Sequence, residues 1–132
     1  MQIRISDETG TLAIVENLSS ATQLLDNIKN DSGGRPVCLF ANPTTGPDQP
    51  ALKIGIMGST GFVRYTDLSG ANWWSSFHHE GAATVTRFTF GANGDELQVP
   101  TGALVPYTDI QLALLEYMAH GWRRPNLASL LK

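Results

Sequence analysis

Cysteine is almost missing from this chain, and long apolar runs are missing altogether. Cys38 is the one cysteine among 132 residues, so no disulfide can form within the chain. A reducing compartment is therefore the expected setting. No apolar stretch approaches the roughly 20 residues that a membrane-spanning helix needs. The first residues also lack the charged, then apolar, then small-residue pattern of an export signal, so we expect a cytoplasmic protein.

Basic residues are few. Nine Lys and Arg residues stand against 12 Asp and Glu residues, which gives a formal net charge of −3. This balance disfavours nucleic acid as the main partner, because no basic cluster in the sequence would replace phosphate counterions. The hydrophobic content of 42% is that of an ordinary globular protein, and the length predicts a single domain over residues 1–132.

Catalytic and cofactor motifs are missing as well. Ser59 lies in Gly58-Ser59-Thr60-Gly61 between two expected strands, whereas a nucleophile elbow joins a strand to a helix. Cys38 lies in an apolar run, where burial disfavours the reactive thiolate. No glycine-rich loop opens onto a helix N-terminus to hold a phosphate. These features predict that the chain is not an enzyme and needs no cofactor.

One cluster of metal-ligand side chains is present, His78-His79-Glu80. Adjacent histidines lack the i, i+4 spacing of metal-binding helices, and no third histidine or cysteine is near in the sequence. A solvated loop is the simpler interpretation, so no metal site is expected. A small hydrolase or ring-opening enzyme that uses these three residues stays open as an alternative. Metal in the pure protein, together with a shifted histidine pKa, would favour it.

Apolar periodicity predicts several strands, a helix, further strands and a closing helix. Strands are expected at residues 2–5, 12–15, 37–41, 52–56, 62–66, 84–90 and 96–99. The run 37–41 is wholly apolar, which favours a strand buried on both faces. Turn residues at 58–61 and 91–94 separate strand pairs and predict hairpins. The fold class is therefore α+β, with an antiparallel sheet of about six strands and two helices packed on one face.

The two helices are predicted from apolar residues at helical spacing. Ser19 or Ser20 is the expected N-cap of the first helix, and residues 31–34 are its expected end. Pro106 suits the first turn of the second helix, and Gly121 suits its end. The expected buried stripes are Ala21, Leu24, Leu25 and Ile28 in the first helix, and Ile110, Ala113, Leu114, Tyr117 and Met118 in the second. Further apolar residues at Leu112, Leu115 and Ala119 predict that the second helix is buried on most sides.

The segment 68–83 follows neither period and carries two adjacent tryptophans. Trp and Tyr are favoured at protein interfaces, because they bring large area and a polar group at little cost in rotamer entropy. We therefore expect a partner-binding surface here, with Trp73, Trp74 and Phe77 as anchors and Asp67, His78, His79 and Glu80 at the rim. Asp95 and Glu96, at a hairpin tip, could also present carboxylates to a basic partner. The alternatives are that one tryptophan covers the open sheet face and that the carboxylates are ordinary solvated charges.

Three motifs give the chain a resemblance to a known family. The first is the hairpin from Leu52 to Asp67, which ends in Tyr65-Thr66-Asp67 before the aperiodic segment. The second is Val105-Pro106, followed by a helix with Tyr117-Met118 in its last turn. The third is Gly121, followed by Arg124-Pro125 and an apolar tail. In this order and spacing they resemble the first-numbered immunity-protein family of bacterial polymorphic toxin systems, small proteins encoded beside deaminase-type toxins. Relatives often have a tryptophan near the end, where this chain has Leu130.

The resemblance implies a non-enzymatic antitoxin of interbacterial competition, which binds a cognate toxin domain and occludes its active site or substrate groove. The implied toxin is a zinc-dependent nucleic-acid deaminase, and the zinc would be held by the toxin rather than by this chain. A structural or small-ligand-binding domain, with the tryptophans lining a pocket, stays open as an alternative from another class.

Overall fold

The computed structural model describes residues 2–7, 10–44, 51–66, 68–70, 72–75, 85–90, 95–100 and 103–119. Its strands are β1 (Ile3–Asp7), β2 (Gly10–Val15), β3 (Val37–Pro43), β4 (Ala51–Met57), β5 (Thr60–Thr66), β6 (Asn72–Trp74), β7 (Val85–Phe90), β8 (Asp95–Pro100) and β9 (Val105–Pro106). Its helices are α1 (Leu18–Ser32) and α2 (Tyr107–Ala119). The α+β class is thereby confirmed.

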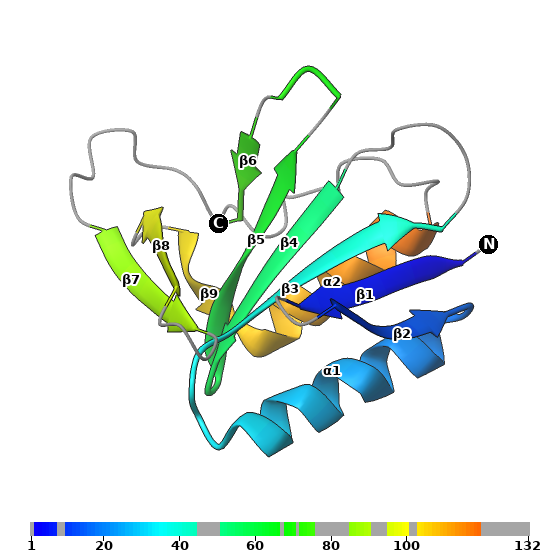
Figure 1. The fold of residues 1–132 in the computed structure, drawn as a ribbon, viewed down its shortest axis with the longest axis horizontal. Helices are drawn as coiled ribbons and strands as arrows, with labels where there is room; N and C mark the ends of the chain where they lie inside the picture. The colour runs from blue at the N-terminus through cyan, green and yellow to red at the C-terminus, as the bar shows by residue number, and fades with distance from the viewer. Residues whose placement is uncertain are drawn as a thin grey trace.

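One antiparallel sheet of seven strands forms the centre of the structure. Its strand order is β2-β1-β3-β4-β5-β6, and the short β9 also pairs with β5. Both helices lie on the same side of this sheet (Figure 1). Strands β7 and β8 form a separate two-stranded sheet. Both predicted hairpins, β4–β5 and β7–β8, are confirmed. The prediction of one sheet of about six strands included β7 and β8, which lie outside the main sheet, and did not include the short β6 and β9.

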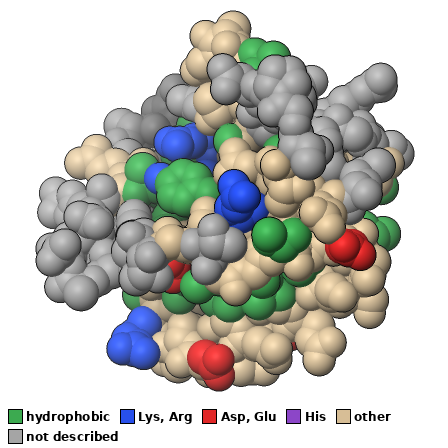
Figure 2. All heavy atoms as spheres, turned by 45° about the vertical axis from the view of Figure 1, so that its right-hand side comes forward, with side chains coloured by type: hydrophobic (Ala, Val, Ile, Leu, Met, Phe, Trp, Pro, Cys, Tyr) green, Lys and Arg blue, Asp and Glu red, His purple; other side chains and the backbone are tan. Residues whose placement is uncertain are grey.

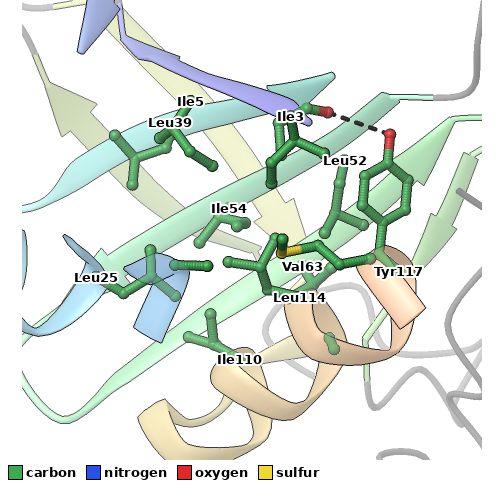
Figure 3. Packing of buried hydrophobic residues seen from close by; sticks show 14 of the residues in the cluster. Ile3, Ile5, Leu25, Leu39, Leu52, Ile54, Val63, Ile110, Leu114 and Tyr117 are labelled. Carbon is green, nitrogen blue, oxygen red and sulfur yellow. Dashed lines mark hydrogen bonds between the residues drawn. The ribbon is translucent and has the colours of Figure 1, made fainter. Parts of the chain in front are cut away.

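The main core lies between the sheet and the two helices. Figure 3 shows strand residues such as Ile3, Leu39 and Ile54 facing Leu25 of α1 and Leu114 of α2, all fully or almost fully buried. The five residues predicted as the buried stripe of α2, Ile110, Ala113, Leu114, Tyr117 and Met118, are all buried. In α1, Ala21 and Leu25 are buried, while Leu24 and Ile28 pack partly against the core. The periodic patterns therefore located the core correctly.

The predicted N-cap of α1 was wrong. Asn17 is the cap: it has an extended backbone, and its side-chain oxygen accepts a hydrogen bond of 2.8 Å from the amide of Ser20. Ser19 and Ser20 lie inside the first turn instead. The predicted end is confirmed, because Gly33 takes the left-handed conformation (φ 61°) directly after the last helical residue, Ser32.

The prediction that α2 is buried on most sides was only partly right, since Leu112 is 50% exposed. The two helices are joined by side-chain hydrogen bonds. The Tyr107 hydroxyl donates to Asp26 Oδ1 over 2.7 Å, and Gln111 Nε2 donates to the same oxygen over 3.0 Å. Burial raises the pKa of the Tyr107 hydroxyl, and the hydrogen bond to the Asp26 carboxylate raises it further. The phenol therefore remains a donor and holds α2 against α1.

A second, smaller apolar cluster lies on the opposite face of the sheet. It consists of Cys38, Phe62, Val99 and Ala103, with Met57, Trp74, Leu97 and Leu104 packed against it. Residues of β8 and of the segment before β9 therefore cover one end of this face. Strand β3 is buried on both faces at Cys38 and Leu39, as predicted, but Phe40 is only half-buried. The part of this second face that the described residues leave uncovered is called the open face below.

Candidate functional site

The two adjacent tryptophans lie on an edge strand of the main sheet. The segment 68–83 was predicted to have no regular structure, but residues 72–74 form β6, which pairs with β5. In the pairing register Trp73 lies opposite Tyr65, and Trp74 lies opposite Arg64. Successive strand residues point to opposite faces. Trp73 therefore belongs to the helix-covered face at its margin, where it is 43% exposed, and Trp74 belongs to the open face.

Trp74 packs on a platform that the neighbouring strands provide. Its ring centre lies 5.6 Å from that of Phe62, and the two planes are tilted by 53°. Phe62 is fully buried and occupies the space beside Gly55, which has no side chain to fill it. The alternative that one tryptophan covers the open face of the sheet therefore holds for Trp74. Its half-buried ring nevertheless leaves surface available to a partner.

A row of four half-buried side chains crosses the open face from β3 to β6. Phe40 lies opposite Lys53, Lys53 opposite Arg64, and Arg64 opposite Trp74. The Lys53 ammonium is 4.7 Å from the centre of the Phe40 ring, and the Arg64 guanidinium carbon is 5.5 Å from the Trp74 ring. Both distances fit cation–π contacts. These four side chains are called the aromatic–cationic row below.

Among the described residues, the electrostatics of the row are unfavourable. Burial lowers the pKa of the Lys53 ammonium, the neighbouring charge of Arg64 lowers it further, and Cys38 acts in the opposite direction. The Nε of Arg64 is buried and has no hydrogen-bond partner in the part of the chain that the structure describes. Figure 2 shows basic side chains on either side of a hydrophobic one near the middle of one face of the molecule, with the prominent acidic side chains nearer its margin. The row is thus a positively charged, partly dehydrated surface.

Ser75 fixes the end of β6 and so the position of Trp74. Its side chain is fully buried, accepts a hydrogen bond of 2.9 Å from the amide of Val63, and donates one of 2.7 Å to the carbonyl of Ala103. Its own amide donates to the carbonyl of Val63 over 2.9 Å. One hydroxyl therefore joins β5, the end of β6 and the segment that leads into β9.

Replacing Ser75 with alanine should lower the free energy of unfolding by about 2 kcal/mol, because the amide of Val63 and the carbonyl of Ala103 would each lose a buried partner. Urea unfolding at unchanged m-value measures this. Ser32→Ala is the matched control, since the Ser32 hydroxyl makes a single bond to the helical carbonyl of Lys29 and should cost less than about 1 kcal/mol. Equal urea midpoints for wild type and Ser75→Ala would show that the hydrogen bonds of the Ser75 hydroxyl do not stabilise the fold.

Comparison with known protein families decides what kind of protein carries this surface. The family model for immunity protein Imm1 matches residues 14–130. The chain belongs to this family. An immunity protein has a cognate toxin as its partner. The exposed aromatic and charged side chains are therefore candidate contacts with that toxin. No curated protein sequence matches the chain. No helix in the described part of this immunity protein is long and apolar enough to cross a membrane.

The structure describes the side chains of only two of the predicted partner-binding residues of this immunity protein, Trp73 and Trp74. Asp95 and Glu96 belong to β8, where their backbones pair with Phe90 and Thr89, but their side chains are not described. Asp67, Phe77, His78, His79 and Glu80 lie outside the described residues. Within the part of the chain that is described, no group of three His, Cys, Asp or Glu side chains could hold a metal ion.

Sequence reasoning missed the cationic part of the site. Lys53 and Arg64 stand at polar positions of two strands that the sequence already paired, and pairing them in register would have placed one opposite the other. The register of this hairpin was therefore the signal in the sequence that could have predicted the pair of cations. Phe40 was missed for another reason, since a run expected to be buried on both faces gives no sign of a half-buried residue.

A concave region lies between the helices of the immunity protein. It is a shallow groove of about 450 Å³, lined by Leu18, Ser19, Thr22, Gln23, Asp26 and Leu115. Its one acidic group, Asp26, accepts hydrogen bonds from Tyr107 and Gln111 and is engaged in joining the helices. The acidic group of the groove is therefore already hydrogen-bonded, whereas the open face has a buried donor without an acceptor among the described residues.

Proposed function

We propose that this immunity protein binds the catalytic domain of its cognate toxin and blocks the toxin's active site with the surface around β6. Membership in the immunity-protein family carries the proposal. Two features support the choice of surface: the 43% exposed Trp73 at the sheet edge, and the half-buried Trp74 beside Arg64, whose buried Nε has no hydrogen-bond partner among the described residues. The chain acts by occupying the cleft, so it needs no catalytic residue or cofactor of its own.

The anchors of the interface are Trp73, Trp74 and Phe77, and the rim is formed by Asp67, His78, His79, Glu80, Asp95 and Glu96. Tight inhibition needs an interface of about 1,600 Å² in which a few well-packed aromatic residues supply most of the binding energy. Because β6 is an edge strand, a partner that encloses its end can contact Trp73 on one face and Trp74 on the other.

The toxin domain is a nucleic-acid deaminase, acting in the same cytoplasm as the immunity protein. This class is supported by the resemblance of the chain to immunity proteins encoded beside deaminase-type toxins. Such enzymes use a zinc-bound water to attack the base, in a pocket that receives a single unstacked nucleotide. The zinc belongs to the toxin, and the immunity protein has only to exclude the nucleotide from the pocket.

Co-expression with the toxin domain encoded next to this chain's gene tests the proposal. Cells that express the toxin alone should stop growing, and cells that also express the immunity protein should grow. With purified proteins, a zinc-loaded toxin should deaminate single-stranded DNA or RNA oligonucleotides, and one equivalent of the immunity protein should abolish this activity. A catalytically inactive toxin should still bind.

Three outcomes would contradict the proposal in different ways. Growth arrest that the immunity protein does not relieve would overturn inhibition. Inhibition with unchanged oligonucleotide access to the toxin's pocket would overturn active-site occlusion. Turnover of the oligonucleotide by the isolated chain would show that it is an enzyme.

A further inference from the structure

We infer that the aromatic–cationic row of Phe40, Lys53, Arg64 and Trp74 receives the carboxylates of an acidic segment of the toxin domain. The inference rests on the proposed function and adds the chemistry of one contact to it. The carboxylates of the proposed rim would face a basic part of the toxin, whereas this row would face an acidic part.

The positions of the two cations make the row suitable for carboxylates. Lys53 and Arg64 are directly opposed on antiparallel strands, where Cβ atoms lie about 5 Å apart, so one carboxylate can reach both. Arg4 is exposed on β1, opposite Asn42 of β3, and adds a third positive charge to the same face. Arginine binds carboxylates in a two-pronged geometry, and such charge-assisted hydrogen bonds are about twice as strong as neutral ones.

No carboxylate of the described residues neutralises the row. Lys53 contacts the Phe40 ring and Arg64 contacts the Trp74 ring, while Arg64 and Cys38 act on Lys53 only through their charges. The Nε of Arg64 has no acceptor among the described residues, although buried donors are normally paired. Like charges directly opposite each other on a sheet are destabilising. An acidic partner segment would remove this repulsion and supply the missing acceptors.

The alternative occupant, a nucleic-acid strand, fits less well. Protein surfaces that bind nucleic acid contact several phosphates with a series of Lys and Arg side chains. Their affinity depends on the number of phosphates contacted. Among the described residues, the open face offers three cations, in a chain whose net charge is −3. The two rings that flank the cations partly exclude water, which favours a fixed hydrogen-bonded carboxylate over a mobile phosphate chain.

The test uses Lys53→Gln combined with Arg64→Gln, and a matched control, Lys29→Gln combined with Arg35→Gln. The control also removes two positive charges and one cation–π contact, that of Lys29 with Tyr107, but on the helix side of the protein. Titration calorimetry with a catalytically inactive form of the cognate toxin domain measures the affinity of both double variants for the toxin. We expect the row variant to bind about tenfold more weakly, with a reduced dependence on salt, and the control to stay within about twofold of wild type.

Stability provides an independent readout. Because the row variant removes a repulsion as well as two cation–π contacts, its melting temperature should stay within about 3 °C of wild type. If the double variant does not fold, Lys53→Gln alone should weaken binding about threefold and carries the test. Tenfold weaker binding without loss of stability would separate a contact role from a structural one.

The other outcomes overturn the inference. If wild type binds the toxin and the row variant binds within twofold of it, the row is not the acidic contact, while the proposed function stands. If wild type does not bind the toxin at all, both fail. If wild type binds a single-stranded DNA oligonucleotide of 20 nucleotides at micromolar concentration, and the row variant does not, the row takes phosphates rather than protein carboxylates.

Discussion

Replacing Gly55 with alanine should lower the free energy of unfolding by about 3 kcal/mol, near the upper end of the usual cost of overpacking a core. A methyl carbon on Gly55 would lie 2.8 Å from Cζ of Phe62, and closer still to two other atoms of the same ring. Phe62 is fully buried between β4, β8 and Trp74, so its ring cannot swing into solvent. The sheet must distort instead. Urea unfolding followed by circular dichroism measures the loss.

A double-mutant cycle makes this prediction specific. Phe62→Ala alone should cost about 3–5 kcal/mol, because it leaves a cavity and removes the platform of Trp74. With both residues changed to alanine, the new methyl group occupies part of that cavity. The double variant should therefore be less destabilised than the sum of the single variants by at least about 1.5 kcal/mol.

Gly58→Ala is the control within the same hairpin. Gly58 has a positive φ of 63° and open space around it, so alanine there should cost only about 1 kcal/mol of backbone strain. If Gly55→Ala costs no more than Gly58→Ala, or if the cycle is additive, then the ring of Phe62 does not fill the space beside Gly55.

The role of Gly55 shows what a strand pattern can and cannot predict. The alternation of Leu52, Ile54 and Ile56 was sufficient to predict β4, its face toward the core and its pairing with β5. Alternation says nothing about which neighbouring side chain occupies the space at a glycine. That depends on the register across three strands, which places Gly55 between Cys38 and Phe62. The small apolar cluster that contains Cys38 and Phe62 was therefore not predictable from one strand at a time.

The helices show the same distinction. Apolar spacing over several turns predicted both buried stripes, because each stripe is repeated along the helix. The N-cap of α1 rests on a single hydrogen bond, and Asn and Ser are about equally good caps. With Asn17, Ser19 and Ser20 within four residues, composition could not select the one whose side chain accepts from the amide three residues later.

For the candidate site, the sequence located the aromatic segment but not its geometry. A strand of three residues, such as β6, is too short to show a period, so the opposite orientations of Trp73 and Trp74 could not be predicted. The positive charge of the candidate site was also not predicted. The predicted polar contacts were carboxylates of loops and hairpin tips, whereas the described open face presents Lys53 and Arg64 from strands. A net negative chain can carry a positive surface, because net charge does not fix where the charges lie.

Trp74→Ala should weaken binding of the inactive toxin about 30-fold or more, which corresponds to about 2 kcal/mol and to the usual cost of losing an interface anchor. Trp74 contacts both Phe62 and Arg64, so its loss removes an apolar surface and also releases the neighbouring guanidinium. Trp73→Ala should weaken binding about fivefold, since Trp73 extends from the edge of the other face. Titration calorimetry at fixed salt compares the two variants.

Two controls separate loss of contact from loss of stability. Ser75→Ala loosens the same end of β6 but keeps the tryptophan ring, so it should lower the melting temperature and weaken toxin binding much less than Trp74→Ala does. Leu112→Ala truncates an apolar side chain of α2 that is 50% exposed, comparable with Trp73, and should change neither quantity. If Trp74→Ala weakens binding no more than Ser75→Ala does, the tryptophan acts only through folding. If Leu112→Ala weakens binding and Trp74→Ala does not, the toxin contacts the helix layer, because the two residues lie on opposite sides of the sheet.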